Sequence, residues 1–360
     1  MELTTFWFCL IGVLWVGYLV LEGFDFGVGL LLPVLGRDDT ERRVLINTIG
    51  PVWDGNEVWL LVAGGATFAA FPEWYATLFS GFYLALLLIL VSLIIRGVAF
   101  EYRGKIDDPA WRRRWDLAII VGSALPALLW GVAFANIVRG VPIDAHKQFT
   151  GSLLTLLNPY GLLGSLTTLS LFALHGALFL GLRTSGEIRV RAIALAARLS
   201  VPVLVIAGAF AVWTQLAYGS GWTWGAVAVA AVGLALASQA AYAGRELAGF
   251  ALTSIVIVAA VVLIFGSLFP DVMPSSTNPA FSLTVHSASS THYTLVVMTW
   301  VAMIFTPVVI AYQTWSYWVF RARLGIADIP LSIGLSRVPK AGSSPAGAIG
   351  ETRFPDQPVR

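Results

Sequence analysis

Acidic and basic side chains occur inside long apolar stretches of this sequence, where they could carry protons or bind ions. Glu22 and Asp25 lie three residues apart, and Asp54 and Glu57 repeat that spacing, so each pair shares one face of a helix. Ionisable groups in an apolar environment are costly and usually mark a functional pathway. The complete set of such residues is Glu22, Asp25, Asp54, Glu57, Arg96, Glu101 and Lys105.

The elements that position these residues must be membrane helices. Of the 360 residues, 58% are hydrophobic and 12% are charged, whereas a soluble domain carries about 25% charged residues. The net charge of +2 offers no basic face to a nucleic acid, so nucleic-acid binding is excluded. Cys9 is the single cysteine, which excludes a disulfide framework, a c-type haem attachment motif and a cysteine-ligated iron–sulfur cluster.

The apolar runs predict an all-α integral membrane protein with nine transmembrane helices, as two pseudo-symmetric four-helix bundles plus one peripheral helix. We expect a membrane domain over residues 1–324 and a disordered cytoplasmic tail, rich in Pro, Ser and Gly, over residues 325–360. The predicted spans are 6–34, 51–71, 78–102, 116–138, 160–182, 199–217, 224–242, 250–270 and 292–319.

The distribution of Lys and Arg predicts the orientation of the chain in the membrane. Nineteen of the 22 basic residues fall in the tail and in the alternate loops on its side of the membrane. The other loops hold Arg139 and Lys147, and Arg96 lies inside a span. We therefore expect the N-terminus outside and the C-terminus in the cytoplasm. The first span is too long for a signal peptide, and no basic residue precedes it.

This orientation places the ionisable residues in the cytoplasmic half of the first three spans, which should pack together because they are consecutive. Simpler explanations remain open for some of them. Asp54 and Glu57 follow a predicted helix start, where the helix dipole favours acids, and Glu101 could form a surface ion pair with Lys105. Glu22 and Asp25 lie too deep for either explanation, and their plain alternative is a buried pair with Arg96.

The histidines and methionines do not predict a haem in this chain. His175 is the only histidine well inside a predicted span, and a lone helix histidine is more often a hydrogen-bonded packing residue than a ligand. Met298 and Met303 could serve as haem ligands, but methionines in an apolar helix are usually packing residues. We therefore expect no metal ligands in this sequence.

Several motifs resemble subunit II of the cytochrome bd-type quinol oxidases. The most specific is Trp53-Asp54-Gly55-Asn56, within the stretch Gly50 to Trp59. The other matching stretches are Glu22 to Gly29, Arg96 to Lys105, Asn158 to Leu163, Met273 to Thr277 and Met298 to Val301. They occur in order, and the resemblance extends from about Leu3 to Arg323.

The resemblance implies a respiratory terminal oxidase of the bacterial cytoplasmic membrane. Such an enzyme oxidises quinol, derived from menaquinone or ubiquinone, and reduces dioxygen to water with protons from the cytoplasm. It implies a partner, subunit I, that holds two b-type haems and one d-type haem, and small single-span accessory subunits as further partners. This chain would stabilise subunit I, contribute to proton uptake and hold a quinone structurally.

The resemblance also implies roles for individual positions. Asp54, Glu101 and Lys105 resemble proton-pathway positions at the interface with subunit I. Asp25 and Arg96 resemble parts of the same polar interior.

Two tryptophans and two departures from the family pattern complete these expectations. Trp59 is similar to a tryptophan near a proposed oxygen-entry channel, and Trp53 is the second candidate for a place near that channel or near a quinone. Glu101 stands where other members can have Asp, which keeps the acid but changes its reach. Glu57 stands where others can have Gln, so its charge is not expected to be needed.

Two other functions remain open on the sequence alone. In a secondary transporter, Glu22, Asp25, Asp54 and Arg96 would form a proton-coupled substrate site near the midplane. In a purely structural subunit, the same residues would only pack against a neighbouring chain.

Overall fold

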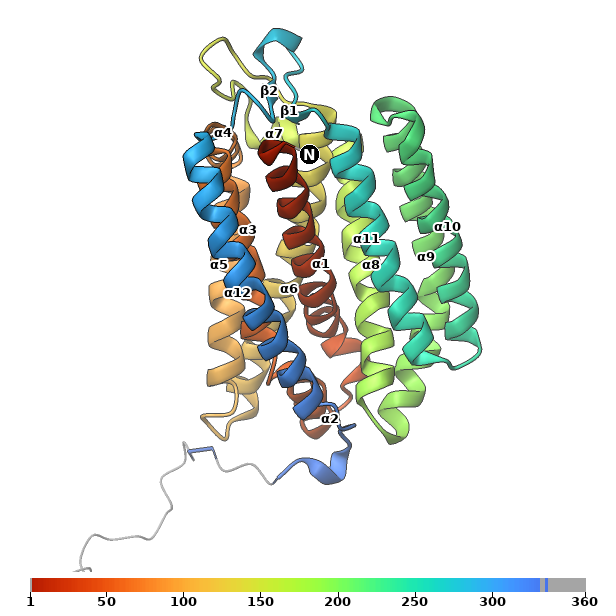
Figure 1. Cartoon of the computed structure of the whole chain (residues 1–360). Coiled ribbons are helices and arrows are strands. Elements are labelled where there is room, and N and C mark those ends of the chain that lie inside the picture. Colours follow the sequence, from red (N-terminus) through yellow and green to blue (C-terminus); the bar gives the residue numbers. More distant parts are fainter. Residues whose placement is uncertain (1, 331–333, 336–360) are drawn as a thin grey trace, which may run out of the picture.

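The computed structural model describes residues 2–330 and 334–335 of the chain. They form a bundle of long helices with a small two-stranded sheet at one end (Figure 1). The elements are α1 (Leu3–Leu35), α2 (Asp39–Ile49), α3 (Trp53–Ala70), α4 (Pro72–Gly81), α5 (Tyr83–Tyr102), α6 (Pro109–Arg139), α7 (Leu153–Leu156), α8 (Pro159–Arg183), α9 (Gly186–Tyr218), η1 (Gly221–Thr223), α10 (Trp224–Tyr242), α11 (Glu246–Leu268), β1 (Asp271–Met273), η2 (Pro279–Phe281), β2 (Leu283–Thr284), α12 (His292–Val319) and η3 (Ile326–Asp328).

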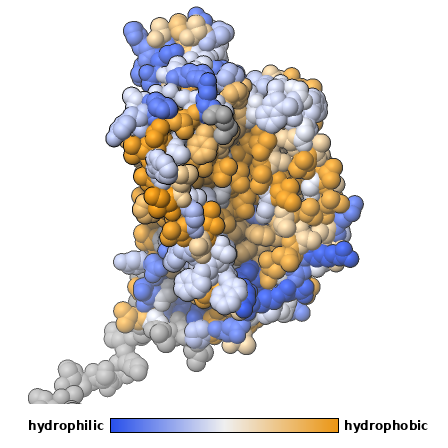
Figure 2. Space-filling model, viewed as in Figure 1, coloured by the Kyte–Doolittle hydropathy of each residue, from blue (hydrophilic) through white to orange (hydrophobic). Residues whose placement is uncertain are grey.

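Eight of the described helices are long and apolar enough to cross a membrane, namely α1, α5, α6 and α8–α12. Figure 2 shows apolar side chains around the middle of the molecule, between two more polar ends. The predicted all-α membrane fold is confirmed. The predicted second span, 51–71, corresponds to α3, which has 18 residues. Because α3 is not one of the eight helices, the count of nine spans stays a prediction.

The two halves of the bundle meet along α1, α6, α8 and α11, which pack on one another. Helices α3, α4 and α5 lie on one flank and α9 and α10 on the other (Figure 1). The first helices of the two halves, α1 and α8, cross at glycines: a Cβ atom on Gly27 would lie 2.1 Å from the carbonyl oxygen of Phe172. The packing of α12 is much lighter, because Leu295 is its one buried residue.

Several helices begin at other residues than the predicted spans, because a helix does not have to end where the apolar character ends. The predicted third span, 78–102, begins inside α4, and α5 starts only at Tyr83, after a break at Phe82. Helices α6 and α9, which contain the predicted fourth and sixth spans, begin before those spans, at Pro109 and Gly186. Their first turns carry arginines and continue each helix. The loop after the first span contains the unpredicted helix α2, whose N-terminus is capped by Asp38.

The helix α2 and the last described residues lie at the opposite end of the bundle from the N-terminus (Figure 1). The predicted tail starts with the described turn η3, and the backbone N–H of Leu335 donates to the carbonyl oxygen of Lys105 at 2.9 Å. Residues 331–333 and 336–360 lie outside the described residues, so the predicted disorder of the tail remains a prediction there.

Candidate functional site

A charged cluster lies inside the bundle, between α1 and α5. Glu22 and Asp25 of α1 and Arg96 of α5 are all fully buried, each with 0% of its surface exposed. The guanidinium of Arg96 forms an ion pair with the carboxylate of Glu22 and lies over the ring of Phe26, 4.7 Å from its centroid. The structure therefore brings together the deepest three of the predicted residues.

Close helix packing makes room for this cluster. At Gly122 of α6, a Cβ atom would lie 2.8 Å from the Cβ atom of Arg96. A larger residue there would push α5 away from α6 and displace the guanidinium. On the opposite side of α1, the Gly27 crossing draws α8 close, so the cluster is enclosed by helices rather than by lipid.

Asn56 of α3 connects the cluster to α12. Its amide nitrogen donates to Oδ2 of Asp25 at 2.7 Å, and its amide oxygen accepts from the Tyr317 hydroxyl at 2.7 Å and from Nε2 of Gln313 at 3.2 Å. Trp59 donates its indole N–H to Oε1 of Gln313 at 2.7 Å. The sequence analysis quoted Asn56 within a motif but missed Gln313 and Tyr317, which carry no charge and stand in an otherwise apolar helix.

The cluster holds more negative than positive charge. Two buried carboxylates face one guanidinium, and Glu57 of α3 is partly buried nearby. Among the described residues, Oε2 of Glu22, Oδ1 of Asp25, and Nε and Nη1 of Arg96 have no hydrogen-bond partner. A buried carboxylate in excess of its counter-charges is a group that can take up and release a proton.

The other predicted proton-pathway residues lie outside this cluster. Asp54, Glu101 and Lys105 are all exposed in the isolated chain, and the described residues show no ion pair between Glu101 and Lys105. Trp53 packs against Phe100 with ring centroids 5.2 Å apart, which brings the start of α3 beside the end of α5. Asp54 and Glu101, the next residues along each helix, are both exposed at this end of the bundle.

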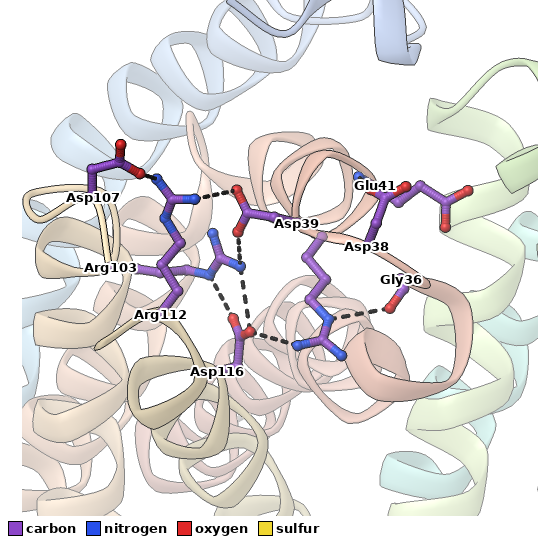
Figure 3. Close-up of polar contacts among 9 residues, drawn as sticks. Gly36, Asp38, Asp39, Glu41, Arg103, Asp107, Arg112 and Asp116 are labelled. Atoms are coloured by element: carbon purple, nitrogen blue, oxygen red, sulfur yellow. Dashed lines mark hydrogen bonds and ion pairs between the residues drawn. The ribbon is translucent and has the colours of Figure 1, made fainter. Parts of the chain in front are cut away.

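The end of the bundle opposite the N-terminus, where α2 lies (Figure 1), is called the basic end because most of the arginines and lysines fall there. At this end a second ionic cluster, which the sequence analysis missed, joins α2, α5 and α6 (Figure 3). Asp116 of α6 accepts from Nε of Arg103 at 2.5 Å and from Nη1 of Arg42 at 2.8 Å. Asp39 accepts from both Arg103 and Arg112, at 2.9 and 3.1 Å. Burial alone would lower the pKa of Arg103, but its bonds to Asp116 and Asp39 raise this pKa above its ordinary value.

His175, the histidine well inside a predicted span, is not placed to ligate a haem. His175 is buried, and its two ring nitrogens contact the Thr253 hydroxyl at 2.7 Å and the carbonyl oxygen of Val20 at 3.2 Å. Its ring also stacks on Phe250, with centroids 4.4 Å apart. Within the described residues, no group of three or more His, Cys, Asp or Glu side chains could hold a metal ion.

An apolar cavity of about 490 Å³ lies between α1, α3, α4, α5 and α6. Its walls include Trp15, Phe68, Trp74, Phe79 and Trp130, and Gly64 faces it without a side chain. The indole nitrogen of the buried Trp74 has no hydrogen-bond partner among the described residues. The cavity could hold an apolar molecule. Trp53 and Trp59 are not among the described residues that line it.

Comparison with known proteins gives one consistent result. Residues 3–320 match the family model for cytochrome bd terminal oxidase subunit II. The chain is 44% identical over 324 residues to the cytochrome bd ubiquinol oxidase subunit 2 of Bacillus subtilis, covering 88% of this chain and 96% of the relative. It is 39% identical over 364 residues to the cytochrome bd-I ubiquinol oxidase subunit 2 of Escherichia coli K12, covering 90% and 95%.

A solved structure shows the same fold. The bd oxidase from Geobacillus thermodenitrificans contains a chain that aligns with a TM-score of 0.74 and 14% sequence identity. The alignment covers 89% of the present chain and 99% of that chain. At this identity the match concerns the arrangement of helices alone.

Proposed function

The chain belongs to the family of subunit II of the cytochrome bd terminal oxidases, and from this premise we propose its part in the reaction. It supports a haem-bearing subunit I, in which quinol is oxidised and dioxygen is reduced to water. It also contributes to the path by which cytoplasmic protons reach the haems. The haems supply the oxygen chemistry, and the residues of this chain position subunit I and hold or move protons.

The proposed proton path starts from the open face of α3 and α5. The observation that supports it is the contact between Trp53 and Phe100, the residues that directly precede Asp54 and Glu101, both of which are exposed. Lys105 follows Glu101 by four residues and is also exposed. A face that carries two carboxylates and a lysine beside apolar helices is suited to a protein partner, because lipid tails cannot solvate these charges.

The buried cluster supports this path from the inside. Arg96 lies on α5, which also carries Glu101, and Asn56 joins Asp25 of α1 to α3, which carries Asp54. We propose that the cluster balances the charge of the path when a proton moves. For this assignment the basic end must face the cytoplasm, with the N-terminus outside, as the distribution of Lys and Arg predicts.

The experiment is Asp54→Asn in the complete two-subunit oxidase, reconstituted in vesicles. We expect slower oxygen consumption at unchanged haem content, because the amide keeps the shape of the side chain but cannot carry a proton. The matched control is Glu187→Gln, which removes an exposed carboxylate at the same end of the other half. Unchanged turnover with unchanged haem content would remove Asp54 from the path, and loss of assembly would favour the purely structural role.

We further propose that the apolar cavity holds a quinone structurally. Its volume of about 490 Å³ lies within the range of roughly 300–1,000 Å³ that is usual for small-molecule sites. Solvent extraction of the purified complex, followed by mass spectrometry, would distinguish menaquinone from ubiquinone.

A further inference from the structure

The helix α12 is attached to the rest of the chain mainly through polar contacts. Leu295 is its one buried residue among 28, so little apolar surface holds it in place. Near its start, the Trp7 indole donates to the carbonyl oxygen of Leu295 at 3.2 Å and to the hydroxyl of Thr299 at 3.1 Å. About four turns later, Gln313 and Tyr317 contact Asn56 of α3.

The hydrogen bonds at this second contact run in one direction. An indole nitrogen can only donate, so Trp59 requires the oxygen of the Gln313 amide to face it. The nitrogen of Gln313 must then face Asn56, which turns the oxygen of Asn56 toward α12 and its nitrogen toward Asp25. Tyr317 adds a second donor to the same oxygen of Asn56. Every donor in this chain of side chains therefore points toward the carboxylate of Asp25.

We propose that Asn56 and Gln313 are positioning residues that link the carboxylate of Asp25 to the placement of α12 on α3. Asp25 fixes the orientation of the Asn56 amide by accepting from its nitrogen. That orientation presents the amide oxygen to Gln313 and Tyr317, and so holds α12. Asp25 itself reaches α12 only through this amide, which is fully buried.

The reasoning predicts an effect at a distance. If the side chain at position 25 could not accept a hydrogen bond, the buried amide nitrogen of Asn56 would keep only its longer bond to the carbonyl oxygen of Leu21, at 3.4 Å, and the amide would be freer to turn. Its oxygen would then leave Gln313 and Tyr317. Because α12 has so little apolar burial, its middle would then be held mainly through its two ends, by Trp7 at the start and by the bond from Arg183 to the carbonyl oxygen of Phe320 at the other end. This inference concerns bonds within the chain and stands apart from the proposed proton path.

Hydrogen–deuterium exchange of the purified two-subunit oxidase tests the proposal. We expect backbone amides of residues 306–319 to exchange about tenfold faster in Asp25→Leu than in the wild type, since one or two hydrogen bonds that hold α12 are lost. Asp25→Asn keeps an acceptor oxygen and should restore the slow exchange. Thr314→Val, an exposed neighbour of Gln313 on α12, is the matched control and should leave exchange unchanged.

A second variant covers the case in which Asp25→Leu fails to assemble. Trp59→Phe removes the donor at the far end and frees the Gln313 amide to turn, so it should also speed exchange in residues 306–319 while leaving Asp25 intact. The proposal is overturned if Asp25→Leu, or in its absence Trp59→Phe, leaves the exchange of α12 at the wild-type rate. It is also overturned if the backbone amides of residues 306–319 exchange as fast in Asp25→Asn as in Asp25→Leu.

Discussion

Replacing Arg96 by glutamine should be the most damaging single change in the buried cluster. In the folded chain Arg96 and Glu22 are both 0% exposed, so removing the guanidinium leaves Glu22 and Asp25 without their shared counter-charge. Breaking a fully buried ion pair in this way costs about 3–5 kcal/mol. The charge count predicts a much smaller effect for Glu22→Gln, of about 1 kcal/mol, because Arg96 and Asp25 then balance each other.

The assay is thermal inactivation of the purified oxidase, followed by size-exclusion chromatography with detection of the haem absorbance. The wild type is compared with Arg96→Gln, Glu22→Gln and the control Arg113→Gln, which alters an exposed arginine at the basic end. The expected order of midpoints is wild type and Arg113→Gln highest, Glu22→Gln slightly lower and Arg96→Gln far lower. Because unfolding of membrane complexes is often irreversible, all variants must be heated at one scan rate.

Two results would refute this reasoning. If Arg96→Gln were as stable as Arg113→Gln, the buried charges would have other partners, and the excess negative charge would carry no cost. If Glu22→Gln were as damaging as Arg96→Gln, the shape of the ion pair would matter more than the balance of charge within the cluster.

Two further changes test the basic end and the cavity. Asp116→Asn should lower the thermal midpoint by an amount corresponding to about 1–3 kcal/mol, because Arg103 and Arg42 lose a carboxylate that is only 5% exposed. A thermal midpoint equal to that of Glu187→Gln would contradict this prediction. Gly64→Leu should lower the quinone content per haem in the purified complex, because the new side chain would enter the cavity, whereas Gly208→Leu, also in open space on α9, should leave it unchanged. Equal quinone content in both variants would argue against this cavity as the quinone site.

The sequence was sufficient to predict the membrane helices and the pairing of charges within them. Hydropathy located α10 and α12 to the residue, because polar residues flank both apolar runs. A buried pair of Arg96 with Glu22 and Asp25 was the plain alternative in the sequence analysis, and the structure pairs Arg96 with Glu22. The helices and the predicted spans differ most where a helix continues beyond the apolar run, as α9 does over its first 13 residues.

Contacts that depend on how helices rotate and cross could not be predicted in this way. Gln313 and Asn56 are 257 residues apart, and nothing in either segment indicates which faces meet. The same holds for Asp116, which lies near a run of arginines but pairs with Arg103 and with Arg42 from the unpredicted α2 region. Asp54 and Glu101 are both exposed and lie outside the buried cluster, whereas the preceding residues, Trp53 and Phe100, are half-buried and pack on each other.

The ion pair between α1 and α5 has a consequence for how the chain is made. Glu22 is synthesised 74 residues before Arg96, which at about 5–20 residues per second is a delay of roughly 4–15 s. During that interval α1 carries two carboxylates with no arginine to neutralise them, so it is a poor candidate for release into lipid on its own. The first helix must therefore wait beside the insertion machinery, or keep its acids protonated, until α5 arrives and the pair can enter the bilayer together.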